Sequence, residues 1–418
     1  MKLFKKKTDY SYYSSYNSKS RRVRVDRVVV AAIAGVILVV AIVAFLNLNR
    51  IKLMVKGYSF STANEIVASF DSGEEKEILS HDKMDHILNW AHESSKVSLF
   101  DEYEKYWSYH KKMKYSEVVE FVDSVFNNQV PQLKSMGYDE KTIWSLLKKD
   151  ASKSDMQYLI DNHLTNEATK EYRKVKGYKL KNMLAYIEKY KEVHDYNYAV
   201  NIVNYPFIVS SNGDANVKYE ISNPDSLLTL VKKGFYLPED YEPKDLVVPN
   251  VSVAPDCENN KLRKAAAKAF EEMAKAAEKE DLHLVLNSGY RSYADQTKTY
   301  KEFETKYGGQ YAAEYVAIPG GSEHQTGLGI DVTAQSVVEG KKLVFGDTEE
   351  YDWVIKHCSD YGFIIRFEEG TDSITGIAHE PWHVRYVGKA VAKEIVKNKW
   401  TFEEYCLYKN VIPSFKKD

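Results

Sequence analysis

The longest apolar stretch of the chain lies close to the N-terminus. VVVAAIAGVILVVAIVAFL, from Val28 to Leu46, runs for nineteen residues without a charge. As a helix it would be about 28 Å long, close to the ~30 Å thickness of a bilayer's hydrocarbon core. A cleaved signal peptide would have a shorter apolar run and a small-residue cleavage site, and AFLNLNR offers neither clearly. The pattern favours a transmembrane anchor over residues 28–49, with a cleaved signal or a buried soluble helix as alternatives.

The next region, 50–204, has apolar residues at helical spacing among many Lys, Glu and Tyr residues. Three Gly-Tyr pairs, at Gly57, Gly137 and Gly177, begin similar segments. Two short helices per about forty residues suit a helical-repeat array. The repeat is incomplete, because a strict forty-residue period needs one more Gly-Tyr pair at 97–98, where the chain has Val97-Ser98. An irregular α-helical domain with coincidental Gly-Tyr turns is the alternative.

Prolines mark the end of the helical pattern. Six of the ten prolines lie between Pro206 and Pro255. Because proline fits neither a helix interior nor a central strand, this stretch predicts a Pro-rich extended connector over residues 205–260.

The last region, 261–418, mixes helix and strand patterns. Lys261–Glu280 is rich in Ala, which is typical of a helix, and LHLVLNS predicts a strand that ends just before Tyr290 and Arg291. Further elements of both kinds follow, namely a helix around 349–360 stopped by Gly362, the strand FIIRF, a strand ending at Glu380 and a helix from Lys389. Strands and helices do not alternate regularly, so the expected fold class is α+β.

Charge is distributed unevenly, although the formal net charge is only -2. Residues 1–27 hold nine Lys or Arg and two Asp, so the rest of the chain is acidic. The positive excess before the apolar run predicts a basic cytoplasmic tail over 1–27 and an extracellular C-terminal bulk. A basic segment confined to the N-terminus does not indicate a nucleic-acid-binding surface on the rest of the protein. Three cysteines, Cys257, Cys358 and Cys406, are too few for a disulfide framework.

The string His-Glu-x-x-His occurs from His379 to His383. On a helix this pattern lets both histidines bind one zinc ion, with the Glu as base. Pro381 lies inside it and would cost a helix roughly 3 kcal/mol. The residues upstream, SITGIA, are rich in β-branched side chains and lack a 3.6-residue period, which favours a strand ending at Glu380. Glu380 and His383 stay candidates for chemistry, and further metal ligands must lie elsewhere.

The segment GGSEHQTGLGIDVT offers two partners for His383, namely His324 and Asp331. An extended chain would separate these two by roughly 23 Å, so they can bind one metal only if the chain folds back, which Gly327 and Gly329 would ease. Two imidazole nitrogens and one carboxylate oxygen leave a tetrahedral zinc one position for water, as in catalytic sites. The alternative is a surface or core histidine beside an ordinary IDV strand.

Four motifs, SGYRSYADQ, SEHQTGLGIDV, GFIIRF and ITGIAHEPWHVRYVG, resemble in this order the VanY-type D-alanyl-D-alanine carboxypeptidases. These belong to a wider metallopeptidase group that includes lysostaphin-like enzymes and the hedgehog domain. The resemblance covers about Asn223 to Tyr405 and implies a zinc peptidase domain of the hedgehog/DD-peptidase type at 261–418. Gly329 departs from the family, which more often has Ala at this position. This difference should alter packing more than metal ligation. The helical region lies outside the resemblance.

Carried over residue by residue, the resemblance implies one zinc ion per chain, held by His324, Asp331 and His383. It makes Glu380 the catalytic base and acid, which takes a proton from zinc-activated water and returns it to the leaving amine.

The resemblance also assigns residues around the reacting bond. Arg291 would stabilise the oxyanion or clamp a substrate carboxylate, so it is both a catalytic and a substrate-binding candidate. Gln296 and Ser322 correspond to positions near bound peptide. Trp382 is expected to pack under the site, and His379 is expected to be a bystander.

These observations predict a membrane-anchored, cell-surface zinc carboxypeptidase that removes terminal D-alanine from peptidoglycan stem peptides. Two alternatives stay open. One is a zincin endopeptidase that uses His379 and His383, and the other is a catalytically silent wall-binding or sensor protein whose functional part is the helical region. The complete set of ligands and base weighs against a silent protein. D,D- versus L,D-specificity and the oligomeric state stay open.

Overall fold

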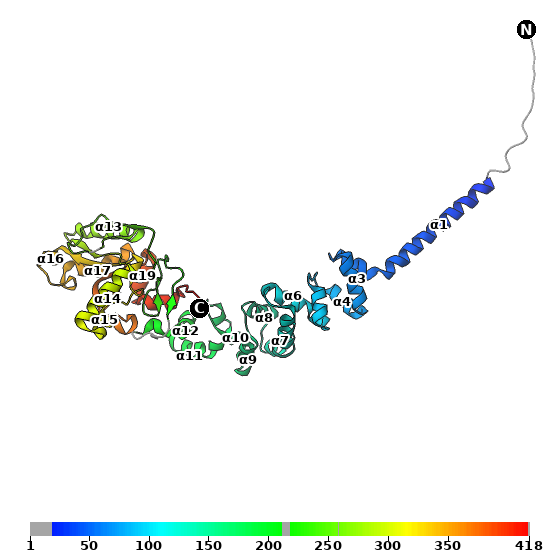
Figure 1. The fold of residues 1–418 in the computed structure, drawn as a ribbon, viewed down its shortest axis with the longest axis horizontal. Helices are drawn as coiled ribbons and strands as arrows, with labels where there is room; N and C mark the ends of the chain where they lie inside the picture. Colours follow the sequence, from blue (N-terminus) through cyan, green and yellow to red (C-terminus); the bar gives the residue numbers. More distant parts are fainter. Residues whose placement is uncertain (1–18, 211–217, 258, 417–418) are drawn as a thin grey trace, which may run out of the picture. The chain divides into compact units, whose positions relative to one another are not determined.

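The computed structural model describes residues 19–210, 218–257 and 259–416 (Figure 1). The chain divides into two compact units, Met1–His163 and Leu164–Asp418. This boundary lies inside the helical region expected over 50–204. The end of the helical region belongs to the second unit, because helix α12 (Tyr196–Asn204) packs on the C-terminal helix α20 (Phe402–Lys409). There the Asn201 side-chain amide donates to the Leu407 carbonyl at 3.0 Å.

The N-terminal apolar run forms helix α1 (Lys19–Leu46). Within it, Arg27–Leu46 has a mean hydropathy of 3.2 and is long and apolar enough to cross a membrane. None of this window is buried against the rest of the chain. A helix that exposes apolar residues on every side is typical of a membrane span. Residues 1–18 of the basic tail lie outside the described residues.

Helices build the rest of the first unit, and all of them except α7 are short. They are α2 (Leu48–Val55), α3 (Phe60–Ser69), α4 (Ser72–Ser80), α5 (Ile87–Glu93), η1 (Val97–Leu99), α6 (Phe100–Tyr109), α7 (Tyr115–Ser135), α8 (Glu140–Leu147) and α9 (Lys153–Asp161).

Two of the Gly-Tyr pairs end a helix in the same way. Gly57 and Gly137 have φ of 101° and 85°, and in both turns the following tyrosine donates its backbone N–H to the carbonyl five residues earlier. A helix whose N-cap side chain accepts a backbone N–H, at Ser59 and Asp139, follows each turn. At Gly177 φ is also 85°, but the tyrosine there bonds three residues back. The first two turns are therefore one local structure, and the third is another.

The second unit opens with short helices: α10 (Asn166–Thr169), η2 (Tyr172–Lys174), η3 (Leu180–Asn182), α11 (Met183–Val193), α12 and η4 (Pro206–Val209).

The Pro-rich stretch that follows is not a free linker. Its prolines keep it irregular, but the apolar residues between them, such as Ile208, Leu230 and Phe235, are fully buried. They share a core with α19 (Lys389–Asn398) and α20. Paired strands within or beside the stretch are two residues long: β1 (Tyr219–Glu220) with β2 (Phe235–Tyr236), and β3 (Leu246–Val247) with β4 (Leu262–Arg263).

A four-stranded antiparallel sheet lies at the centre of the second unit. Its strands are β5 (Leu284–Ser288), β6 (Gly329–Ala334), β7 (Phe363–Phe367) and β8 (Glu380–Tyr386), in the order β5-β6-β8-β7. Helices α13 (Lys264–Glu278) and α17 (Glu349–Tyr361) contact each other and share one core with the sheet (Figure 1). The remaining elements are α14 (Tyr293–Tyr307), α15 (Gly309–Tyr315), η5 (Glu323–Thr326), α16 (Gln335–Val338), η6 (Phe345–Asp347) and α18 (Asp372–Thr375). This is the expected α+β arrangement.

The helix expected around 349–360 and the strand FIIRF are where the pattern predicted them, as α17 and β7. The strand expected to end at Glu380 is wrong. Residues 372–375 form helix α18 instead, which ends at Gly376 with φ +80°. Strand β8 begins only at Glu380. The β-branched residues of SITGIA favoured a strand upstream, but the left-handed turn at Gly376 interrupts that segment.

Candidate active site

Asp331 on β6 and His383 on β8 are direct cross-strand partners. Their neighbours Ile330 and Val384 are buried in the core shared with α13 and α17. Because side chains alternate along a strand, Asp331 and His383 both face the opposite side of the sheet. His383 Nδ1 lies 2.9 Å from Asp331 Oδ1. The sheet register therefore brings together two of the predicted metal ligands.

His324 reaches the same point from η5. Gly327, with φ +64°, ends this short helix and turns the chain back into β6, as the glycine spacing predicted. His324 Nδ1 donates to the carbonyl of Gly289 at 2.8 Å, which leaves Nε2 free to act as a ligand. Nε2 lies 3.4 Å from Asp331 Oδ2.

One ligand atom from each of His324, Asp331 and His383 lies within 4.8 Å of the other two. Two imidazole nitrogens and a carboxylate oxygen are donors that catalytic zinc sites use. The Nδ1 proton of His324 is held by a backbone carbonyl, as is usual for a ligating histidine. These residues thus fit one zinc ion.

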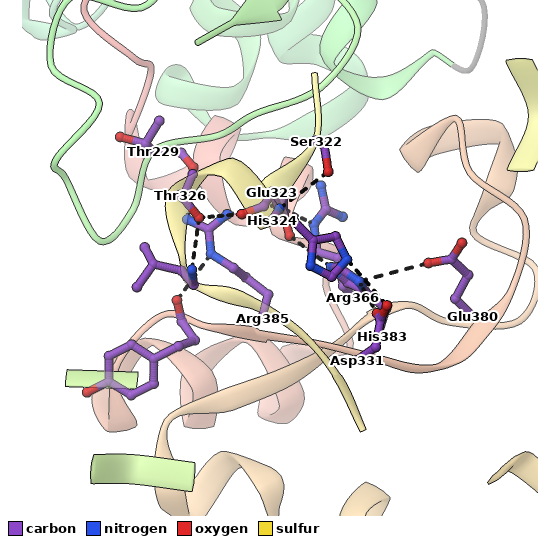
Figure 2. A network of polar contacts seen from close by, with 12 residues as sticks. Thr229, Ser322, Glu323, His324, Thr326, Asp331, Arg366, Glu380, His383 and Arg385 are labelled. Atoms are coloured by element: carbon purple, nitrogen blue, oxygen red, sulfur yellow. Dashed lines mark hydrogen bonds and ion pairs between the residues drawn. The ribbon is translucent and has the colours of Figure 1, made fainter. Parts of the chain in front are cut away.

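Glu380 joins the group through an irregularity in the sheet. Val384 pairs with Ile365 and Glu380 pairs with Phe367, so four residue steps on β8 correspond to two on β7. In a regular strand, residues three apart point to opposite faces, but this bulge lets Glu380 face His383. Glu380 Oε2 lies 4.0 Å from His383 Nδ1, and Figure 2 shows the carboxylate directed at the histidine.

Burial and neighbouring charges set the protonation of the group. Burial raises the pKa of Glu380 to about 7, against the opposing effect of His383. Burial lowers the pKa of His324. Burial would also lower the pKa of His383, but the neighbouring carboxylates of Asp331 and Glu323 outweigh burial and raise this pKa to about 9. The carboxylate of Glu380 is thus the group best placed to exchange a proton near neutral pH.

Arg291 follows β5, just beyond the strand end, as the sequence predicted. Its guanidinium donates to Gln296 Oε1 at 3.0 Å and to Ser288 Oγ at 3.2 Å. Gln296, which is 1% exposed, donates in turn to the Ala317 carbonyl at 2.6 Å. Gln296 therefore holds the arginine in place.

A single cavity of about 470 Å³ is lined by every predicted site residue. Ser322 lies in its wall and caps η5 by accepting from the His324 N–H at 3.4 Å. Trp382 also lines the cavity and is 37% exposed. Trp382 was expected to pack under the site, but it lies in the cavity wall and is partly open to solvent. The predicted residues in the cavity wall are Arg291, Gln296, Ser322, His324, Asp331, Glu380 and His383.

The His-Glu-x-x-His string is not a zinc-protease helix. Pro381 lies in strand β8, so no helix runs through both histidines, as the proline argument predicted. His379 donates from Nδ1 to the Phe367 carbonyl at 2.9 Å and is outside the ligand group found among the described residues. The helical geometry that the zincin alternative requires is therefore absent from residues 379–383.

Three charged residues of the site were missed by the sequence analysis. Glu323, Arg366 and Arg385 are 4%, 3% and 0% exposed. Glu323 lies beside His383, and the two arginines pair with Glu323 (Figure 2). An arginine inside the apolar strand FIIRF was the available signal, because a buried arginine requires a buried acidic partner.

Comparison with known proteins places this site in a family. Residues 259–389 match the family described as VanY: D-alanyl-D-alanine carboxypeptidase. The chain is 44% identical over 187 residues to the putative carboxypeptidase YodJ of Bacillus subtilis, covering 44% of this chain and 68% of that protein. It is 36% identical over 182 residues to the bifunctional D-Ala-D-Ala dipeptidase and carboxypeptidase VanXYC of Enterococcus gallinarum, covering 43% and 92%.

Among solved structures, the LdcB LD-carboxypeptidase is 44% identical, with 44% of this chain and 88% of that chain covered and a TM-score of 0.42. VanYB in complex with D-alanine-D-alanine is 28% identical, with 43% and 96% covered and a TM-score of 0.36. The identities to YodJ and VanXYC extend over more than two thirds of each protein. The chain therefore belongs to the VanY family of D-alanyl-D-alanine carboxypeptidases, and its C-terminal unit is a carboxypeptidase.

Proposed function

We propose that this protein is a membrane-anchored zinc carboxypeptidase that removes the terminal D-alanine from peptidoglycan stem peptides. The observation that carries the proposal is the convergence of His324, Asp331, His383 and Glu380 in one cavity with Arg291. The names of the relatives support the class of substrate.

His324 would bind the metal through Nε2, His383 through Nδ1 and Asp331 through its carboxylate. When bound, zinc supplies a Lewis acid that polarises the scissile carbonyl and lowers the pKa of water. Glu380 accepts a proton from the attacking water and delivers it to the leaving amine of D-alanine. Its burial supports this role, because a carboxyl group shielded from solvent exchanges its proton with the reactants.

Arg291 would recognise the end of the peptide. An exopeptidase must distinguish a free carboxylate from a continuing chain, and an arginine offers two parallel donors to such a group. The guanidinium is held by Ser288 and Gln296 on the cavity wall, so its position is set before substrate arrives.

The direct test is mass spectrometry of synthetic stem peptides incubated with the purified full chain and zinc. One peptide should end in D-alanyl-D-alanine and another in a single D-alanine after an L-centre, so that D,D- and L,D-cleavage are separated. We expect loss of one C-terminal alanine from at least one of them. Intact peptides in the presence of the zinc-loaded protein would contradict the proposal.

The helix α1 supports an anchor with its N-terminus in the cytoplasm and the peptidase outside. Protease added to intact cells should then remove the C-terminal units while a tag at Met1 stays protected. Recovery of a released protein that begins near Asn47 would contradict the anchor and favour a cleaved signal.

The helical region 50–204 would act as an extracellular spacer. The matching turns at Gly57 and Gly137 support two copies of a helical repeat, with the remainder irregular.

The antiparallel sheet and the placement of the ligands on β6 and β8 support the fold type shared by DD-peptidases and the hedgehog domain.

A further inference from the structure

Glu323 is the residue before the metal-ligand candidate His324, yet its side chain points to the other histidine. Its Oε2 lies 3.6 Å from His383 Nε2. Both atoms are buried and neither makes a hydrogen bond. The opposite nitrogen of the same ring, Nδ1, faces Asp331 at 2.9 Å. His383 therefore has a carboxylate close to each of its two ring nitrogens.

A buried chain of charges fixes Glu323. Its Oε1 accepts from Arg366 Nε at 2.9 Å and lies 2.8 Å from the Arg385 guanidinium. Arg366 also donates both terminal nitrogens to Glu403, at 3.0 and 2.7 Å. Lys232 lies 3.7 Å from Glu403. Figure 2 shows Arg366 and Arg385 converging on Glu323 behind the histidine.

Stability alone does not account for this arrangement. Burying charges costs several kcal/mol per ion, and apolar residues of similar volume are often equally stabilising or more so. The chain of charges does one thing that apolar residues could not, which is to hold an anionic oxygen rigidly against His383 Nε2.

We propose that Glu323 is a positioning residue that fixes the tautomer and the ring orientation of His383. A neutral imidazole has one proton, so His383 can bind a metal through Nδ1 only if that proton is on Nε2. Glu323 Oε2 is the acceptor that faces Nε2. The separation of 3.6 Å is about half an ångström longer than a hydrogen bond, so the proposal requires this contact to shorten when Nδ1 binds the metal.

The inference rests on the proposed zinc site, but its test does not depend on turnover. Glu323→Gln removes the charge while keeping the shape. We expect zinc affinity, measured by competition with a chelator, to fall about 10- to 100-fold, which is the usual cost of losing a partner of a ligating histidine. In nitrogen-15 spectra of the zinc-loaded protein, the Nε2 proton of His383 should exchange with water faster than in the wild type.

Glu403→Gln is the matched control. Glu403 is 0% exposed and pairs with the same Arg366, but it does not contact His383. It should lower thermal stability about as much as Glu323→Gln and leave zinc affinity and the His383 signals unchanged. Glu323→Asp, which keeps the charge but withdraws it from the ring, should fold if Glu323→Gln does not, and it should also lose zinc affinity.

Unchanged zinc affinity in both Glu323 variants would overturn the inference. An equal loss in Glu403→Gln would overturn it too, because the chain of charges would then act only through the fold. Failure of the proposed function would look different, since the wild-type protein itself would then not bind zinc or release alanine.

Discussion

Each unit of this protein contains a histidine whose Nδ1 lies 2.9 Å from a carboxylate oxygen, namely His86 with Glu104 in the first unit and His383 with Asp331 in the second. Glu104 also accepts from two backbone N–H groups and from the Trp90 indole at 2.7 Å. These local donors occupy the hydrogen-bond acceptor sites of the Glu104 carboxylate. The pair is a structural clamp in an aromatic cluster around Trp90.

The carboxylate of Asp331 is differently occupied. Its second oxygen faces another histidine, His324 Nε2, at 3.4 Å, and Glu380 lies 4.0 Å from His383. The same pairwise contact therefore serves structure in one unit and metal binding in our proposal for the other. What differs is how many lone pairs remain directed at a common point.

The sharpest way to break the comparison is to remove a ligand. His324→Ala should lose stoichiometric zinc and essentially all activity, because two remaining ligands hold zinc poorly. His379→Ala, four residues from His383, should keep zinc and most activity. His86→Ala should also keep zinc. Metal analysis of the three purified variants is sufficient, and zinc retained by His324→Ala would show that the ligand set is misassigned.

Removing the base should separate metal binding from chemistry. Glu380→Gln should keep zinc while turnover falls by about 100- to 10,000-fold, since the amide cannot accept the proton of water. The measurement is alanine release together with metal content. If the variant turns over near the wild-type rate, the proton acceptor is another group.

Arg291→Lys should weaken recognition of the peptide terminus. We expect kcat/KM to fall about 10- to 100-fold, the value of a hydrogen bond to a charged group, because lysine cannot present two parallel donors. A peptide with an amidated C-terminus is the control, and the loss should be much smaller on it. An equal loss on both peptides would point to the oxyanion instead of the carboxylate.

The smallest effect on function should come from the clamp in the first unit. Glu104→Gln should lower the free energy of unfolding by about 1–3 kcal/mol, because one of two partly buried acceptor oxygens is replaced by a donor amide that faces other donors. Zinc affinity and turnover should stay at wild-type values. Urea unfolding followed by tryptophan fluorescence measures the first, and any change in zinc affinity would mean that the two units are coupled.

Local patterns predicted the residues that are set by strand alternation and by tight turns. Asp331 and His383 meet because they occupy the same face of neighbouring strands, and Gly327 supplies the reversal that brings His324 to them. Sequence reasoning does not reach contacts between residues far apart in the chain. Asn201, in the expected helical region, bonds Leu407, and Glu323 was missed because its partners Arg366 and Arg385 lie far along the chain.

The irregular pairing of β8 with β7 has a consequence for protein engineering. A designer who copied His324, Asp331, Glu380 and His383 onto a regular antiparallel hairpin would obtain the three ligands, but the carboxylate of the base would project to the other side of the sheet. The unit to transplant is therefore the strand with its extra residues, Pro381 included, and a search template for this chemistry should encode the offset pairing as well as the side chains.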